Sequence, residues 1–158
     1  RKYVFNPFQL VMNRGHYYLV GNHESYDDMS TLRVDRIAHI TVLNERRKPL
    51  REIKGYQQQR TFNVSQYVKE HIYMFGGESI TVTFKARRSI VNQILDWFDG
   101  NVEFTNITAD NVVCRVRVNH DAFKYWALQY MQSVKVLTPA SLVTEVKAAI
   151  EEGLHQYS

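Results

Sequence analysis

The sequence is poor in residues that would cross-link it or carry it through a membrane. Its 158 residues include one cysteine and three prolines. A single cysteine excludes an intramolecular disulfide and a zinc site built on cysteine ligands. No stretch approaches the roughly 20 apolar residues that span a bilayer, and no segment resembles a signal peptide. We therefore expect a cytoplasmic protein without a membrane partner.

Signals of catalysis are sparse as well. The six histidines show no pair at the spacing of helical metal ligands and no accompanying cluster of carboxylates. His39 and Asp35 could share one face of a strand, but a general base also needs a substrate pocket. No glycine pattern of a phosphate-binding or dinucleotide-binding loop occurs. We therefore expect no enzyme, no catalytic or metal-binding residues and no cofactor.

Positive charge is concentrated in the first half of the chain. The net charge is +4. Residues 1–79 hold 12 Lys or Arg against 8 Asp or Glu, whereas residues 80–158 hold 8 of each kind. This modest excess is compatible with an anionic ligand such as a nucleic acid, although it is far from a strong electrostatic footprint.

Apolar side chains are plentiful enough to fold the chain. Hydrophobic residues make up 44% and aromatic residues 13% of the sequence, which argues against disorder. The length allows one good core or two small ones. The pattern changes near Gly76-Gly77, where glycine permits a bend, so we expect two domains over residues 1–76 and 77–158.

Short extended segments dominate the first half. Alternating apolar residues predict strands over residues 3–12, 16–21 and 31–43, and helical spacing behind Asn63 predicts a helix within residues 63–72. The order is similar to that of a small β-barrel of the SH3 or Sm type, whose first strand we expect to precede this chain. A basic run, residues 46–48, is interpreted as a solvated loop rather than a phosphate contact.

The second half has a clearer pattern. Its periods predict strands over residues 80–86, 102–107, 112–118 and 134–137. They predict helices over residues 90–98 and 123–130 and from residue 138 onward. The order βαββαβ followed by a helix is that of a ferredoxin-like sandwich. The fold class expected for the whole chain is therefore α+β.

Several residues of this half are expected to fill its core. Cys114 lies in the apolar phase of its strand, and the aromatic helix has core spacing at Phe123, Trp126 and Tyr130. Gly100 is expected to end the preceding helix in a left-handed conformation. The final helix should bury one face, made of Leu142, Val146, Ile150 and Leu154.

The most informative segments are Gly15–Asn22 and Leu32–Ile37, which join an aromatic strand to one that carries two arginines. Arg36 falls within the apolar stripe of the second segment. A buried guanidinium needs a partner, because burying its charge alone costs several kcal/mol. The partner is either an internal acid, such as Asp35, or an external anion. A β-bulge that turns Arg36 outward is a third interpretation.

A set of ordered motifs resembles the WYL domain, a ligand-sensing module of bacterial transcription regulators, and the C-terminal extension that follows it in those proteins. The motifs cover nearly the whole chain and are, in order, Pro7-Phe8, Asn13-Arg14-Gly15, Tyr17 to Gly21, Arg33 to Ile37, Met74 to Glu78, Tyr125-Trp126-Ala127 and Leu137-Thr138-Pro139. Two positions differ from the family. Tyr17 replaces the tryptophan of the family's name, and Ser30 stands where a further arginine is common.

The resemblance implies an effector-sensing region that recognises a nucleic acid or a nucleotide, with single-stranded DNA favoured. Arg14, Arg33 and Arg36 would hold phosphate groups while Tyr18 stacks on a base, and Asp35 belongs to the same candidate site. Tyr17 and Tyr18 must point to opposite faces of their strand, so only one of them can line the ligand surface.

The resemblance also implies partners. We expect a homodimer, and we expect contact with promoter DNA through an N-terminal helix-turn-helix domain that this chain lacks. Two other interpretations remain open. The ligand could be a small anionic metabolite, or the chain could be a dimerisation module in which Arg36 pairs internally and no ligand exists.

Overall fold

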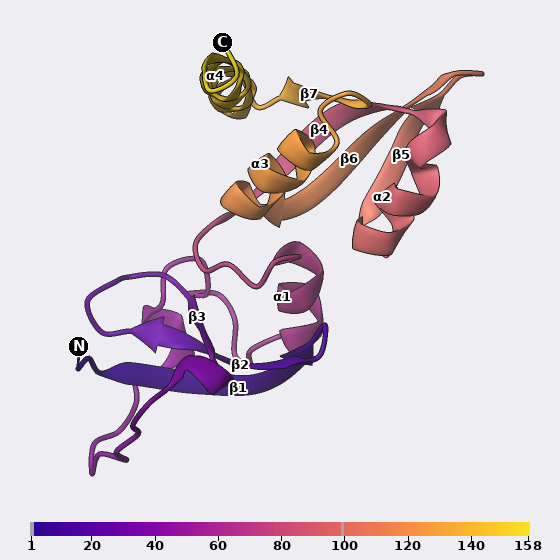
Figure 1. The fold of residues 1–158 in the computed structure, drawn as a ribbon. Coiled ribbons are helices and arrows are strands. Elements are labelled where there is room, and N and C mark those ends of the chain that lie inside the picture. Colours follow the sequence, from indigo (N-terminus) through magenta and orange to yellow (C-terminus); the bar gives the residue numbers. More distant parts are fainter. Residues whose placement is uncertain (1, 99) are drawn as a thin grey trace. The chain divides into compact units, whose positions relative to one another are not determined.

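The computed structural model of the protein describes residues 2–98 and 100–158. The chain forms two compact units. The first unit contains the residues up to Val68 together with Met74–Glu78, and the second contains Lys69–Tyr73 and Ser79–Ser158. Both units combine strands with helices (Figure 1), as expected for an α+β protein.

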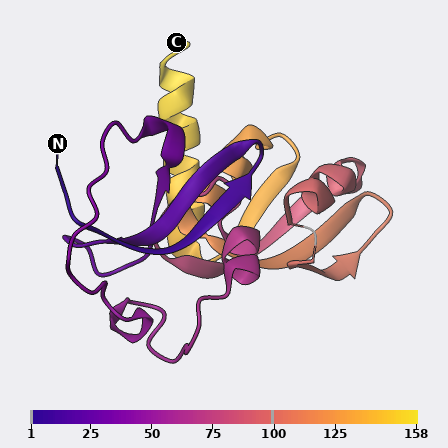
Figure 2. The same cartoon turned by 90° about the horizontal axis from the view of Figure 1, so that it is seen from below.

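A three-stranded antiparallel sheet forms the frame of the first unit, with β2 (His16–His23) between β1 (Phe5–Asn13) and β3 (Ser30–Arg33). Figure 2 shows β1 and β2 as a long hairpin in indigo and purple. The hairpin turns through Arg14 at φ 48° and Gly15 at φ 79°, both in the left-handed region, which explains a glycine in this turn.

Apolar side chains from distant segments fill the core of this unit. Its buried members are Val11, Val20, Met29, Leu50, Ile53, Tyr67 and Met74. The helix α1 (Val64–Glu70) begins where the sequence predicted, because the side chain of Asn63 accepts a hydrogen bond of 3.1 Å from the backbone N–H of Gln66. The cap that was inferred from the sequence is therefore confirmed.

The prediction of a strand over residues 31–43 is wrong beyond Arg33. The 3-10 turn η1 (Val34–Arg36) follows β3 directly, and residues 37–49 contain no helix or strand. Ile40 and Val42, whose alternation suggested a strand, are exposed. Alternation alone cannot make a strand, because the backbone also needs a neighbour to pair with. The described residues of this unit form an open sheet and show no closed barrel.

The second unit has the predicted order of elements. It contains β4 (Ser79–Arg87), η3 (Arg88–Ile90), α2 (Val91–Phe98), β5 (Val102–Ile107), β6 (Asn111–Asn119), α3 (His120–Gln129), β7 (Val134–Thr138) and α4 (Ala140–His155). The strands pair antiparallel in the order β5-β6-β4-β7, and α2 and α3 lie on one face of this sheet (Figure 1). This arrangement confirms the ferredoxin-like sandwich with a C-terminal helix.

The core of the second unit lies between its sheet and its helices. Cys114 is fully buried there, and burial raises the pKa of its thiol to about 11. The rings of Phe84, Phe98, Phe123 and Trp126 pack against one another, with the Phe98 and Trp126 centroids 4.8 Å apart in an edge-on arrangement. The interpretation of the aromatic helix as core rather than as a stacking surface is confirmed for Phe123 and Trp126, whereas Tyr125 is exposed.

The predicted buried face of the last helix is only partly correct. Leu142 is fully buried, but Ile150 is exposed and Leu154 is 67% exposed. At about 1.5 Å per residue, this helix of 16 residues extends well beyond the two elements that it packs against, α3 and β7. The apolar periodicity continues along α4 after the covering surface has ended.

Replacing Phe84 with alanine should lower the free energy of unfolding of the second unit by about 3–5 kcal/mol, because it leaves a cavity among buried rings. Urea denaturation followed by tryptophan fluorescence measures this, since Trp97 and Trp126 both lie in this unit. The exposed Ile107→Ala is the control and should change the free energy by less than about 0.5 kcal/mol. Equal losses in the two variants would contradict the core described above.

Candidate nucleic-acid interface

The pairing of β2 with β3 brings two of the predicted site residues together. Tyr18 lies directly opposite Arg33, and on its other side Tyr18 lies opposite Val11 of β1. Directly paired residues of antiparallel strands point to the same face. Val11 is buried and Tyr18 packs against the core of the unit. Tyr18 and Arg33 are therefore neighbours on the inner face of the sheet.

Arg33 and Asp35 form a two-pronged ion pair at the end of this face. The Nη2 of Arg33 lies 2.6 Å from Oδ2 of Asp35, and its Nε donates to Oδ1 at 3.0 Å. The same Nη2 lies 3.3 Å from Nδ1 of His16. The turn η1 places Asp35 beside Arg33, because two residues of extended strand would have carried it about 6.6 Å away.

Each partner of this pair shifts the pKa of the other. The hydrogen bonds from Arg33 hold the pKa of the Asp35 carboxyl below its ordinary value, and the nearby charge of Arg36 contributes to the same shift. The carboxylate raises the pKa of Arg33 in turn. Both side chains are partly open to water, with 25% of Arg33 and 53% of Asp35 exposed. A pair of this kind is held weakly enough to exchange partners.

Arg36 does not lie in a buried stripe. It is exposed at the end of η1, so the argument that it must have a buried partner is wrong. The physical reason is that β3 ends at Arg33, which breaks the alternation before position 36 is reached. Arg14, also exposed, occupies the β1–β2 turn two residues before His16. The structure thus brings Tyr18, Arg33 and Asp35 together and leaves Arg14 and Arg36 on the adjoining turns.

The two tyrosines of β2 point to opposite faces, as predicted. Tyr17 is 56% exposed and lies opposite Met12 on the outer face of the hairpin. Tyr18 lies on the inner face and is half-buried. The tyrosine next to the arginine of the candidate site is therefore Tyr18.

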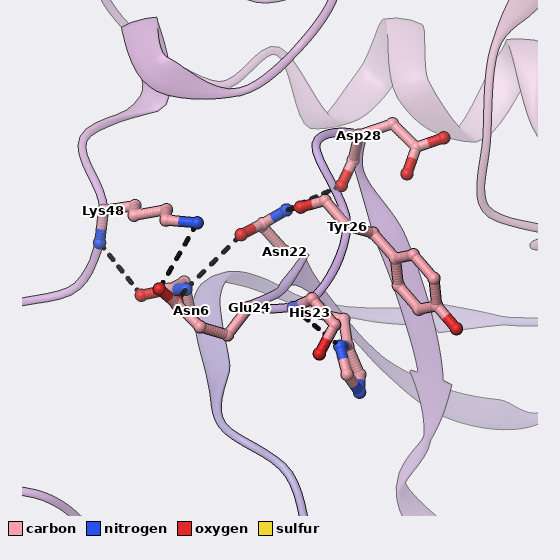
Figure 3. Close-up of polar contacts among 8 residues, drawn as sticks. Asn6, Asn22, His23, Glu24, Tyr26, Asp28 and Lys48 are labelled. Carbon is pink, nitrogen blue, oxygen red and sulfur yellow. Dashed lines mark hydrogen bonds and ion pairs between the residues drawn. The ribbon is translucent and has the colours of Figure 1, made fainter.

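Reasoning from the sequence missed Asn22, which fixes the loop before β3. Its side chain is fully buried, and its amide nitrogen donates to the backbone oxygens of Tyr26 at 2.8 Å and Asp28 at 2.9 Å (Figure 3). The sequence did contain one signal. Asn22 shares the inward phase of Tyr18 and Val20, and a buried amide at such a position needs partners.

A second asparagine extends this polar network to the basic run at residues 46–48. Asn6 donates to Oε2 of Glu24 at 2.7 Å and accepts a bond of 2.9 Å from the backbone N–H of Lys48 (Figure 3). The Nζ of Lys48 lies 3.4 Å from Oε1 of Glu24. These bonds hold the pKa of Glu24 below its ordinary value, with the bond from Asn6 as the main cause.

Arg47 is also committed to the fold. Its Nη1 donates to the backbone oxygen of Pro7 at 2.6 Å, and its guanidinium lies 4.4 Å from the centre of the Phe8 ring. Two of the three cations in the basic run therefore fasten their segment to β1 and to Glu24, which follows β2. Residues 46–48 lie in a loop, as predicted, with Arg46 and Arg47 exposed, and Arg47 and Lys48 also bond neighbouring segments.

The fold and the site can be compared with known proteins. Residues 1–42 match the family model of the WYL domain, and residues 77–154 match that of the WCX domain. All five predicted site residues fall within the first match. No curated protein matches the chain.

Two solved structures are similar to nearly the whole chain. One is a CRISPR Cas-related protein, with 15% identity over 99% of this chain and 44% of that chain and a TM-score of 0.56. The other is proteasome accessory factor B/C (PafBC) of Arthrobacter aurescens, with 20% identity over 98% of this chain and 22% of that chain and a TM-score of 0.46. This chain spans less than half the length of either protein, and at such identities the likeness concerns the fold alone.

The pair of Arg33 and Asp35 predicts a specific titration. Because the folded pKa of Asp35 lies below its ordinary value of 3.8, the pair's contribution to stability is present above pH 3.8 and is lost as the pH falls through the lower folded pKa. An NMR titration of the carboxyl groups should show Arg33→Gln raising the pKa of Asp35 toward 3.8. The same titration curve in both proteins would show that Arg33 does not bond this carboxylate in solution.

Proposed function

The chain belongs to the proteins that join a WYL domain to a WCX domain, and from this premise we propose that it is the effector-sensing region of a bacterial transcription regulator. The proposed effector is a single-stranded nucleic acid or a nucleotide, with single-stranded DNA favoured. Binding would control a DNA-binding domain located elsewhere in the full regulator. The proposed role is recognition, without a catalytic step.

One observation carries this proposal: an aromatic ring and a guanidinium are direct neighbours on one face of a sheet, since Tyr18 pairs with Arg33. Single-stranded nucleic acids offer each base as a stacking partner and each phosphate as an anion, and proteins bind them with rings and cations placed side by side. Arg14 and Arg36, exposed on the two turns at this end of the sheet, add further cations. The site therefore combines charge with stacking.

Asp35 has a defined part in this proposal. In the protein without ligand its carboxylate bonds Arg33 at two points, which is the geometry that a phosphate group would use. A phosphate that binds Arg33 must displace this carboxylate or share the guanidinium with it. Asp35 is thus an internal competitor of the ligand, and its removal should strengthen phosphate binding.

A homodimer is the partner that we propose for this region. The outer face of the hairpin exposes Leu10, Met12 and Tyr17, and Met12 and Tyr17 lie directly opposite each other. Adjacent exposed apolar side chains of this kind mark interaction surfaces. A second copy of the chain would cover them, and a two-fold arrangement suits regulators that bind paired half-sites in DNA.

Substitutions at Arg33 and Tyr18 should weaken binding in two distinguishable ways. Arg33→Ala should cost about 1–3 kcal/mol of affinity for a short oligothymidine and should flatten its salt dependence, because the cation that binds phosphate is removed. Tyr18→Ala should cost about 1–3 kcal/mol while leaving the salt dependence nearly unchanged, because it removes no charge. Tyr18 also packs against the core, so the melting temperature of this variant is measured alongside its affinity. Fluorescence anisotropy titrations over a range of salt concentrations measure both quantities.

Asp35→Asn is the matched control for this experiment. It removes the competing charge and keeps the shape of the side chain, so it should raise the affinity of the oligonucleotide. If Arg33→Ala lowers the melting temperature but leaves affinity unchanged, the arginine only stabilises the fold. If the unmodified chain fails to bind the oligonucleotide even at low salt, the preferred effector becomes a small anionic metabolite.

Met12→Glu should convert the proposed dimer to a monomer, because it would place a carboxylate from each copy in an apolar contact. Sedimentation velocity at micromolar concentrations detects the change in mass. Met131→Glu changes a similarly exposed methionine in the second unit and should leave the dimer intact. An unmodified chain that sediments as a monomer would contradict this proposal.

A further inference from the structure

The sheet of the second unit has a polar face that its own helices leave uncovered. The inward side chains of β4, such as Val82 and Phe84, are fully buried in the core beneath α2 and α3. The alternate residues Thr81, Lys85 and Arg87 point the other way and are exposed. This outward face contains the cations Lys85 and Arg87 of β4, Arg115 and Arg117 of β6, and Lys135 of β7.

Two lysines on this face lie directly opposite each other. Lys85 of β4 pairs with Lys135 of β7, and both side chains are exposed. Like charges at directly opposite positions of a sheet destabilise it. Arg87 follows Lys85 on the same face, about 6.6 Å along the strand. Within residues 2–98 and 100–158, none of these three cations forms an ion pair.

The other two cations of the face are already neutralised. Arg115 lies 3.6 Å from Glu103, and Arg117 lies 3.3 Å from Glu70. The uncompensated charge is therefore concentrated on β4 and β7. We call Lys85, Arg87, Arg88 and Lys135 the basic strip.

An open surface hollow lies at the end of this strip. Its volume is about 380 Å³, and it is lined by Arg87, Arg88, Ser89, Ala109, Asp110 and Asn111. The backbone N–H of Arg88 donates to the backbone oxygen of Asp110 at 2.8 Å, which joins the end of β4 to the β5–β6 turn. The guanidinium of Arg88 makes one long bond of 3.5 Å, to the oxygen of Thr108. Two guanidiniums, a hydroxyl and an amide thus line the hollow together with one acid, Asp110.

We propose, resting on the proposed function for the class of ligand, that the basic strip binds successive phosphate groups of a single-stranded nucleic acid. Four cations spread over β4, η3 and β7 suit a polymer with several charges better than they suit one small anion. In the described part of the chain, the exposed aromatic residues lie outside β4, β6 and β7, so this face contributes charge and no stacking. Binding here is independent of base sequence and strongly dependent on salt.

This binding surface is separate from the site that contains Tyr18 and Arg33, and it involves a different unit. It accounts for the repulsion between Lys85 and Lys135, which a bound phosphate relieves. It also gives the WCX domain a part in ligand binding, since every residue of the strip lies within residues 77–154.

The test uses two double variants of the full chain. One combines Lys85→Gln with Lys135→Gln, and the other combines Arg87→Gln with Arg88→Gln. The probe is a labelled oligothymidine of about 12 nucleotides, a length within the range of single-strand binding sites. Each pair should weaken binding by roughly tenfold or more, the equivalent of one charge-assisted hydrogen bond. The slope of log K against log salt should become shallower by about 0.7 for each phosphate that the variant no longer neutralises.

Lys147→Gln is the control for loss of a lysine outside the strip, because Lys147 is 76% exposed on α4 and pairs with Glu151. It should leave affinity and slope unchanged. The lysine double variant should melt at the same temperature as the unmodified chain or higher, since it removes a repulsion, so reduced binding cannot be attributed to misfolding.

Repeating the titrations with Tyr18→Ala separates this inference from the proposed function. Strip variants that still weaken binding in that background support the inference. Strip variants that leave affinity and salt slope unchanged, while Tyr18→Ala and Arg33→Ala weaken binding, overturn it and leave the proposed function standing. Competition by an oligoglutamate of equal charge, with equal potency, would also overturn it, since the strip would then recognise an acidic peptide.

Discussion

The candidate site of the first unit depends on the hydrogen bonds of one buried amide, that of Asn22. Its nitrogen bonds two backbone oxygens of the loop before β3, and its oxygen lies 3.4 Å from the side-chain nitrogen of Asn6. Each of these groups, if left unpaired inside the protein, would cost about 1–3 kcal/mol. The loop therefore has one favourable path, which brings Ser30 opposite Gly21 and consequently Arg33 opposite Tyr18.

The second unit could be predicted closely from its sequence, whereas the first was predicted for its first two strands and its helix but not for residues 34–49. In the second unit nearly every strand and helix has one apolar face, and local signals such as the left-handed Gly100 agree with that periodicity. Residues 37–49 of the first unit have the apolar alternation of a strand but no neighbour to pair with. The predicted buried face is wrong at the end of α4 for a similar reason, since the apolar residues of this helix continue beyond the surface that covers them. The apolar pattern of a segment shows which side chains favour burial, whereas their actual burial depends on the elements that pack beside the segment.

The candidate site was likewise predictable from the sequence only in part. The opposite orientations of Tyr17 and Tyr18 follow from strand geometry alone, and the pairing of an arginine with Asp35 was one of the interpretations that the sequence left open. The arginine concerned is Arg33 rather than Arg36, because β3 ends at Arg33, ten residues earlier than its alternation suggested. The contact between Tyr18 and Arg33 depends on strand register, which a loop of buried polar bonds determines and which no local pattern encodes.

The ion pair between Arg33 and Asp35 has a consequence for selectivity. A carboxylate two residues away stays beside the guanidinium at an effective concentration in the millimolar range or above, whatever the cell contains. Under the proposed function, a free anion with one phosphate would compete with this carboxylate at a single contact. A polymer that engages several cations at once would gain from each contact and could open the pair. The pair would then act as a threshold of valency that favours a strand over small phosphates.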